Sequence, residues 1–276
     1  MNIAFFGHNS FAAQDLIISL KKKYKTYIFS RRENKKSIFY FDLNKKNLKI
    51  KKSNKLNKID YLFFFSSFVP LKENKSTWAQ CKSTNVDGLI SLLKNLYVPV
   101  NKIILASSCS LYDPKEELND EESFLKPFSG YSLSKFMQEN ILRVYCYKKN
   151  IMFLTYRLGY VYGNKINDKR LVKKILLNYK KNKKINIYNS SLNLNLIHTK
   201  DISNLILKTF KKAEGTFNLT DKNKVTLGNF CQILKGKKVK TFKKKNNYSP
   251  KKFFNKFPYL KVPKLENRIN DFINGN

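Results

Sequence analysis

The chain has 276 residues, of which 42% are hydrophobic and 14% aromatic, and its formal net charge is +36. This length and apolar content suffice to bury one large domain, or a domain with a smaller lobe, and they exclude a disordered chain. The four cysteines, Cys81, Cys109, Cys146 and Cys231, show neither CxxC nor metal-ligand spacing. We therefore expect reduced thiols in a cytoplasmic protein, without a disulfide framework or a metal site.

The positive charge comes almost entirely from lysines that are spread along the chain. Arginine, whose planar fork suits phosphate and base recognition, occurs only at Arg31, Arg32, Arg143, Arg157, Arg170 and Arg268. This pattern favours a solvated lysine surface over a specific nucleic-acid site, with weak nonspecific binding to polyanions.

No membrane association is predicted. The opening MNIAFFG lacks the basic segment, long apolar stretch and cleavage site of a secretory signal. The longest apolar run, residues 59–70, is interrupted by Asp60, Ser66 and Ser67 and is too short to cross a bilayer.

Short apolar runs alternate with helical patterns through the first two thirds of the chain, as in βαβ units with a parallel sheet. The predicted strands are residues 2–6, 25–30, 61–66, 102–107 and 151–157, and the predicted helices are residues 12–22, 83–95 and 130–149. The fold class is therefore α/β, a doubly wound Rossmann-type parallel sheet. Ligands of such folds bind beyond the carboxyl ends of the strands.

The pattern changes after Gly163. A helix at residues 169–181 leads to an Asn-rich stretch, and then to LIHTKDISNLILKTF, which indicates a strand end followed by an amphipathic helix. We predict a sheet domain over residues 1–164 and a small C-terminal lobe over residues 165–276, with about 196–212 packing back on the sheet domain.

Tyr131 and Lys135, in the run YSLSK, are four residues apart and share one face of a predicted helix. A nearby ammonium favours the ionised phenol and lowers its pKa from about 10, so that the phenol exchanges protons near neutral pH. In a chain with 16 tyrosines such a spacing also arises by chance. The surrounding segments must therefore decide its meaning.

Those segments resemble the extended short-chain dehydrogenase/reductase family, the NAD(P)-dependent epimerases and dehydratases that mostly act on nucleotide sugars. The matching segments are, in order, AFFGHNSFAA for the first strand and phosphate loop, IDYLFFFSS for the fourth strand, NVDG on the next helix, IILASSCSLYDP for the serine-bearing strand, YSLSK for the catalytic helix, RLGYVYG for the turn after the sixth strand, and IHTKD for a later helix. The resemblance covers almost the whole chain. It implies an enzyme with a dinucleotide-binding domain and a substrate-binding lobe.

The resemblance implies a catalytic set of Ser108, Tyr131 and Lys135. Tyr131 would give and take a proton at a sugar hydroxyl or ketone, and Lys135 would hold the nicotinamide ribose and lower the tyrosine's pKa. Ser108 would hydrogen-bond the reacting oxygen, with Ser107 as the alternative if the alignment is one residue off.

The first turn is expected to hold the cofactor, because backbone N–H groups and a helix dipole there face a pyrophosphate. The family's three glycines are reduced to Gly7, with Ser10 and Ala13 at the other two positions and Phe11 between them. Ser10 is expected to need a glycine-like backbone at a cost of about 1 kcal/mol, which would weaken binding. Ser66, at another strand end, completes the expected cofactor site.

The second predicted strand ends in YIFSRRE, with Ser30 where an NAD-preferring member carries an acidic residue. Arg31 and Arg32 suit a 2′-phosphate, so NADP is the preferred cofactor and NAD the alternative. A pair of solvated loop arginines is the other interpretation of this motif.

The reaction type follows from the residues after the serine. The family's dehydratases carry an acidic pair there, whereas this chain has Cys109 and Ser110, so epimerisation or reduction at a sugar ketone remains. The stretch SSCSLY also resembles the GDP-fucose synthase branch. Cys109 is then either a second acid/base group or a small buried thiol.

Several positions depart from the family. The arginine that grips the substrate's diphosphate corresponds to Leu194, and Leu158 and Tyr160 replace the usual proline and asparagine. His198 and Asp201 match a lobe motif and are expected to be structural. A nucleotide sugar is the expected substrate and a homodimer a possible assembly.

Two alternatives to an active enzyme stay open. One is a catalytically weak or inactive member of the same fold that acts as a cofactor-binding or regulatory protein, and the other is a polyanion-binding protein.

Overall fold

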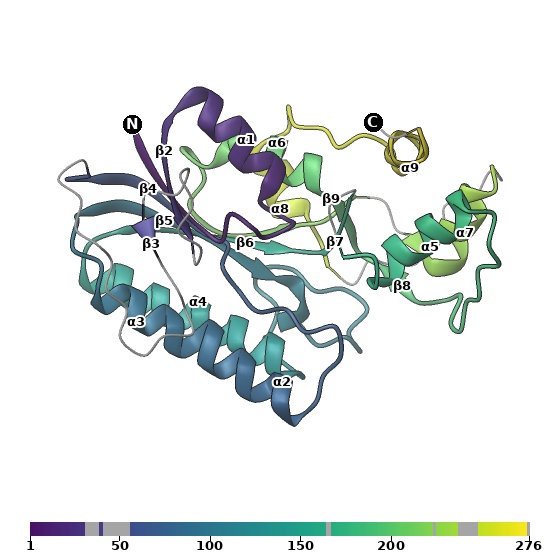
Figure 1. Ribbon diagram of the computed structural model, residues 1–276, viewed down its shortest axis with the longest axis horizontal. Coiled ribbons are helices and arrows are strands. Elements are labelled where there is room, and N and C mark those ends of the chain that lie inside the picture. Colours follow the sequence, from purple (N-terminus) through teal and green to yellow (C-terminus); the bar gives the residue numbers. More distant parts are fainter. Residues whose placement is uncertain (31–38, 41–55, 164–166, 223–224, 237–247, 275–276) are drawn as a thin grey trace.

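The computed structural model describes residues 1–30, 39–40, 56–163, 167–222, 225–236 and 248–274. Its centre is a seven-stranded sheet whose described pairings are all parallel (Figure 1). The strand order is β10 (Gly215–Leu219), β6 (Met152–Leu158), β5 (Val100–Ser108), β4 (Ile59–Phe64), β1 (Asn2–Phe6), β2 (Lys25–Ser30) and β3 (Phe39–Tyr40). The order reverses between β1 and β4, which confirms the doubly wound α/β fold.

Helices cover both faces of the sheet, because successive residues of a buried strand point to opposite sides. Ile3 and Phe5 of β1 belong to one core cluster, whereas Ala4 and Phe6 belong to another. The first face is covered by α1 (Gln14–Lys23), α6 (Thr199–Thr209) and α8 (Lys251–Lys256), and the second by α3 (Gly88–Lys94) and α4 (Gly130–Lys148) (Figure 1).

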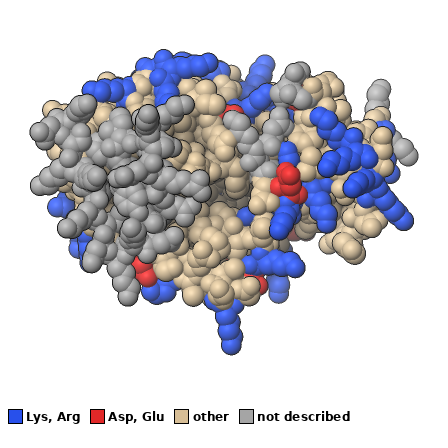
Figure 2. Space-filling model, viewed as in Figure 1, with Lys and Arg blue, Asp and Glu red and all other residues tan. Residues whose placement is uncertain are grey.

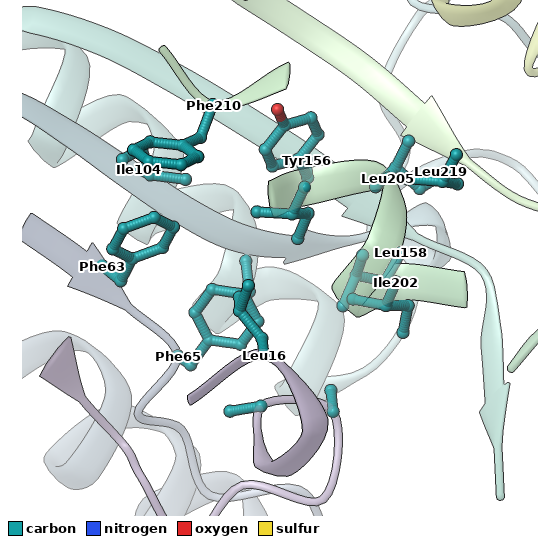
Figure 3. Packing of buried hydrophobic residues seen from close by; sticks show 14 of the residues in the cluster. Leu16, Phe63, Phe65, Ile104, Tyr156, Leu158, Ile202, Leu205, Phe210 and Leu219 are labelled. Carbon is teal, nitrogen blue, oxygen red and sulfur yellow. The ribbon is translucent and has the colours of Figure 1, made fainter. Parts of the chain in front are cut away.

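The first cluster joins the sheet to segments far along the chain. Phe63 of β4 and Ile104 of β5 lie beside Phe210, which follows α6 (Figure 3). Tyr156 of β6 and Leu205 of α6 belong to the same cluster. The rings of Phe63 and Phe210 are 5.4 Å apart. The core that supports the early strands is therefore completed only by residues beyond 200.

One predicted helix is longer than its sequence pattern indicated. The helix expected at residues 83–95 begins as α2 (Lys75–Gln80), continues through a π-helical segment, η1 (Cys81–Asp87), and ends as α3. Its early start has a local cause, since the Asn74 side chain accepts from Thr77 N at 2.9 Å and Thr77 Oγ1 accepts from Asn74 N at 2.8 Å.

The remaining elements form a lobe at the right of Figure 1. It contains the parallel pair β7 (Tyr160–Tyr162) and β9 (Leu196–His198), the antiparallel pair β8 (Asn193–Leu194) and β11 (Val225–Thr226), and the helices α5 (Leu171–Lys180), α7 (Leu227–Leu234) and α9 (Leu265–Ile273). These elements share a core of their own. The chain nevertheless returns to the sheet at β10 and α8, so the division at residue 164 stays a prediction.

The surface carries many basic side chains. On the face shown in Figure 2, Lys and Arg occupy several separate areas, including one on the right over the lobe, and acidic residues are few. None of the described helices is both long and apolar enough to cross a membrane.

Candidate active site

Two adjoining cavities lie at the carboxyl edge of the sheet. The Tyr131 cavity, of about 410 Å³, is lined by the ends of β5 and β6, by α4 and by the lobe. The Gly7 cavity, of about 340 Å³, is lined by the loops that follow β1 and β4. The two share Ser10, Phe11, Phe65, Ser67, Val69 and Arg170. Together they occupy the place where doubly wound sheets bind ligands.

Most of the predicted site residues line these cavities. Ser108, Tyr131 and Lys135 line the Tyr131 cavity, and Gly7, Ser10, Phe11 and Ser66 line the Gly7 cavity. Ala13 lines neither, because its side chain is fully buried in the core beneath α1. Arg31 and Arg32 lie outside the described residues.

The first turn of α4 carries Tyr131. Ser129 and Ser132 cap the helix reciprocally, with Ser132 N donating to Ser129 Oγ at 3.1 Å and Ser129 N to Ser132 Oγ at 2.8 Å. A Cβ at Gly130 would lie 2.7 Å from the Trp78 ring, so only glycine fits there. Lys135 follows Tyr131 by one turn, which brings both residues into the same cavity.

The environment of Tyr131 differs from the sequence prediction. Burial raises the pKa of Tyr131 to about 12, while a hydrogen bond with Ser108 and the charge of Arg170 oppose the shift. The predicted lowering of this pKa by Lys135 is wrong, because removing the phenol from water outweighs the favourable charges. At pH 7 the phenol is neutral and is a proton donor.

Lys135 is held by oxygen atoms from two strand ends and from its own helix. Its Nζ donates to Ala106 O at 2.6 Å, to Ser67 Oγ at 2.8 Å and to Gln138 Oε1 at 2.9 Å. Burial lowers the pKa of Lys135 to about 7, and Glu139 opposes this shift. The three acceptors match the three donors of an ammonium group and fix its position at the floor of the cavity.

A buried ion pair fixes α4 to the sheet one turn after Lys135. Arg157 of β6 donates to both carboxylate oxygens of Glu139, at 3.0 and 2.8 Å, and to Tyr112 Oη at 2.7 Å. Tyr112 Oη in turn donates to Asn218 Oδ1 at 2.9 Å. Arg157 therefore positions the helix that carries the candidate catalytic residues.

Cys109 is a buried thiol. Its Sγ donates to Arg157 O at 3.2 Å, and burial raises the pKa of the thiol well above its usual value. A thiol that stays protonated in this way is a poor acid/base group at neutral pH.

The turn after β1 requires one glycine. Gly7 has φ +90°, and a Cβ there would lie 2.4 Å from Ser66 N in the loop after β4. Among the described non-glycine residues, only Asn150 and Asn182 have a positive φ. The expected strain at Ser10 is therefore wrong, because Ser10 N donates to Gly7 O and Ala13 N to Ser10 O, both at 2.9 Å, in ordinary turn geometry.

Sequence reasoning missed several lining residues, two from the lobe, Arg170 and Asn195, and one, Tyr248, that packs against Tyr112. Arg170, Asn195 and Tyr248 all line the Tyr131 cavity. The rarity of arginine in this lysine-rich chain could have pointed to Arg170 as a site residue. Nothing in the sequence distinguishes Asn195 or Tyr248 in that way. Among the described residues, Ser107 Oγ and Asn195 Oδ1 are the buried side-chain polar atoms without a hydrogen-bond partner, and both residues line this cavity.

His198 and Asp201 lie away from both cavities. His198 Nδ1 accepts from Lys200 N at 3.2 Å, and burial lowers the pKa of His198 to about 4. Asp201 of α6 forms an ion pair with Arg268 of α9. The pair ties the lobe's last helix to the sheet domain, in keeping with a structural role.

No group of three or more His, Cys, Asp or Glu that could hold a metal ion occurs within the described part of the chain.

Comparisons with known proteins place this geometry in a family and a fold. The model of the NAD dependent epimerase/dehydratase family matches residues 4–220. Similar solved structures include a variant UDP-glucuronic acid 4-epimerase from Bacillus cereus with UDP-4-deoxy-4-fluoro-glucuronic acid and NAD (TM-score 0.82, 15% identity, 100% of this chain and 99% of that chain covered). A UDP-glucose 4-epimerase from Thermotoga maritima with UDP-glucose is also similar (TM-score 0.81, 16% identity, 99% and 98% covered). No curated protein matches the sequence. At these identities the structural likeness concerns the fold alone.

Proposed function

This chain belongs to the NAD dependent epimerase/dehydratase family, and we propose that it is an NAD(P)-dependent 4-epimerase or ketoreductase of a nucleotide-activated sugar. The observation that carries the proposal is the meeting of Ser108, Tyr131 and Lys135 in one cavity that adjoins the Gly7 cavity. The similar solved structures, which hold UDP-sugars or NAD, support the choice of ligands.

The Gly7 cavity suits a dinucleotide. The loop before α1 borders it, and no acidic side chain lines it among the described residues. Gly7, Ser10, Phe11 and Ser66 would hold the cofactor there, and Lys135 would reach its ribose by exchanging one of its three protein acceptors. A bound nicotinamide supplies the hydride acceptor and donor for oxidation and reduction at a sugar carbon.

The protein's own residues handle the proton. The neutral phenol of Tyr131 protonates a ketone oxygen during reduction, and the reverse step needs the phenolate. The hydrogen bond from Ser108 and the charge of Arg170 both favour that phenolate. Ser108 Oγ lies 2.9 Å from Ser110 Oγ and accepts from Ser110 N at 3.1 Å, which holds it beside the phenol.

Turnover of UDP-glucose, UDP-glucuronic acid and UDP-N-acetylglucosamine with either cofactor tests this proposal. Tyr131→Phe is expected to lower kcat about 10²- to 10⁴-fold, because it removes the acid/base group. Tyr188→Phe is the control, since Tyr188 is fully exposed and lines neither cavity, and its kcat should equal that of the wild type.

Absence of turnover with every substrate, together with tight cofactor binding, would favour the regulatory alternative. Mass spectrometry of the nucleotide that copurifies with the protein identifies the cofactor directly.

For the cofactor, we propose NADP in preference to NAD, on the strength of Arg31 and Arg32 in the sequence. The structure does not describe these two residues, and the similar epimerases hold NAD. Titration of the protein with each cofactor should give tighter binding of NADP, and Arg31→Gln should reduce that difference. Equal or tighter binding of NAD by the wild type would overturn the preference.

For the assembly, we propose a homodimer that forms through the solvent face of α4. Leu133, Met137, Val144 and Tyr147 are exposed and recur on one side of this helix. Sedimentation should show a dimer, and Val144→Glu should shift it to a monomer. A monomeric wild type at all concentrations would refute the assembly.

A further inference from the structure

Arg170 stands between the two cavities. It immediately precedes α5 in the lobe, it lines both cavities, and its Nη2 donates to Val69 O at 3.2 Å in the loop after β4. Arg157 and Arg268 are each paired with carboxylates. Among the described residues, no carboxylate forms such a pair with Arg170. Its guanidinium group therefore lines both cavities without an ion pair to a described carboxylate.

The Tyr131 cavity contains other groups that suit a polar ligand. The buried atoms Ser107 Oγ and Asn195 Oδ1 have no hydrogen-bond partner among the described residues. Leaving such atoms unpaired costs about 1–3 kcal/mol each, and both belong to residues that line the cavity. Among the described lining residues, Lys135 has its three donors occupied by the protein, Arg170 is the cation with donors to spare, and Glu73 is the acid, so Arg170 is the group that suits an anionic ligand.

Leu194 stands at the position where the resemblance implies a phosphate-binding arginine, and this position does not line the cavity. Leu194 is 3% exposed, pairs with Val225 in the β8–β11 ribbon and packs in the core of the lobe. Its neighbour Asn195, by contrast, lines the cavity. Among the described residues of the lobe, Arg170 is the one with a positive charge that lines this cavity, and it is therefore the candidate to bind the substrate's phosphates.

We propose that Arg170 binds the diphosphate of the nucleotide-sugar substrate, in place of the arginine that is absent at Leu194. The inference rests on the proposed function. A guanidinium group has five N–H donors, of which Val69 O accepts from one, and it binds phosphate oxygens through two parallel hydrogen bonds.

Calorimetric titration with UDP and with uridine separates the phosphates from the nucleoside. Arg170→Met is expected to weaken UDP binding about 10- to 100-fold, because it removes a charge-assisted pair, and to leave uridine and NAD(P) binding within about twofold. Lys174→Met is the matched control, since Lys174 is exposed on the same helix, and it should leave UDP binding unchanged. Arg170→Lys should recover part of the loss.

The outcomes distinguish this inference from the function on which it rests. Equal UDP affinity in the wild type and Arg170→Met would overturn the role of Arg170 and leave the proposed function intact. Loss of NAD(P) affinity instead of UDP affinity would make Arg170 a cofactor ligand and would also overturn it. A wild type that binds NAD(P) but not UDP would overturn both. Thermal melts of each variant verify that it is folded.

Discussion

The two walls of the Tyr131 cavity are built in different ways. On the sheet wall, Lys135 has three close acceptors and α4 is fixed to β6 by the buried pair of Arg157 and Glu139. On the lobe wall, Arg170 has one backbone acceptor among the described residues, and no described group donates to Asn195 Oδ1. Ser107 Oγ on the sheet wall also has no partner in the described part of the chain, so the walls differ in how their cations are held. This difference indicates that chemistry is assigned to the wall whose cation is fully paired, and substrate recognition to the wall whose cation still has donors to offer.

The buried Arg157–Glu139 pair and the Arg268–Asp201 pair test whether the sheet wall is held more firmly than the lobe. Glu139→Gln is expected to lower the free energy of unfolding by about 3–5 kcal/mol, because it leaves Arg157 buried without a counter-charge. Asp201→Asn breaks the pair with Arg268, whose side chain is 15% exposed, and should cost about 1.5–3 kcal/mol. Urea unfolding of both variants measures the difference. Equal losses would show that the sheet wall is not held more firmly than the lobe.

Gly7 and Gly215 have similar φ angles, and substitutions at the two positions test how closely the loops after β1 and β4 approach each other. Gly7→Ala and Gly215→Ala both put a side chain at positive φ, at +90° and +86°. A Cβ at Gly7 also meets Ser66 N at 2.4 Å, whereas nothing lies within 4 Å at Gly215. We expect a loss of about 1 kcal/mol at Gly215 and about 2–4 kcal/mol at Gly7. Similar losses for the two variants would mean that the loop at Ser66 moves aside freely.

The burial of Lys135 predicts a pH dependence of stability. Its pKa is about 7 in the folded protein and about 10.5 when unfolded, so the unfolded chain binds the extra proton between these values. The stability of the wild type relative to Lys135→Met should therefore rise with pH from about 8 to 10, by at most about 1.4 kcal/mol per pH unit. Lys174→Met, at an exposed site, should show no such slope. A flat profile for Lys135 would mean that its ammonium is as stable inside the cavity as in water.

Local sequence signals predicted most of the sheet wall. Apolar runs located β1, β2, β4, β5 and β6 but missed the edge strands β3 and β10. The spacing of Tyr131 and Lys135 brought both to one cavity because i and i+4 residues share a helix face. The same signals misjudged the pKa of Tyr131, since burial depends on elements that pack around it from elsewhere in the chain. Ser10 was also misjudged, because its turn is formed by hydrogen bonds that no residue-type rule specifies.

The sequence was enough to predict the alternation of strands and helices through the first two thirds of the chain and the residue types at those strand ends, because periodicity and caps act over a few neighbouring residues. Only the tertiary structure decided that Arg170 faces the cavities while Leu194 is buried in the lobe core. That assignment depends on contacts between residues about 100 positions apart, such as Arg170 with Val69, and no local pattern records them.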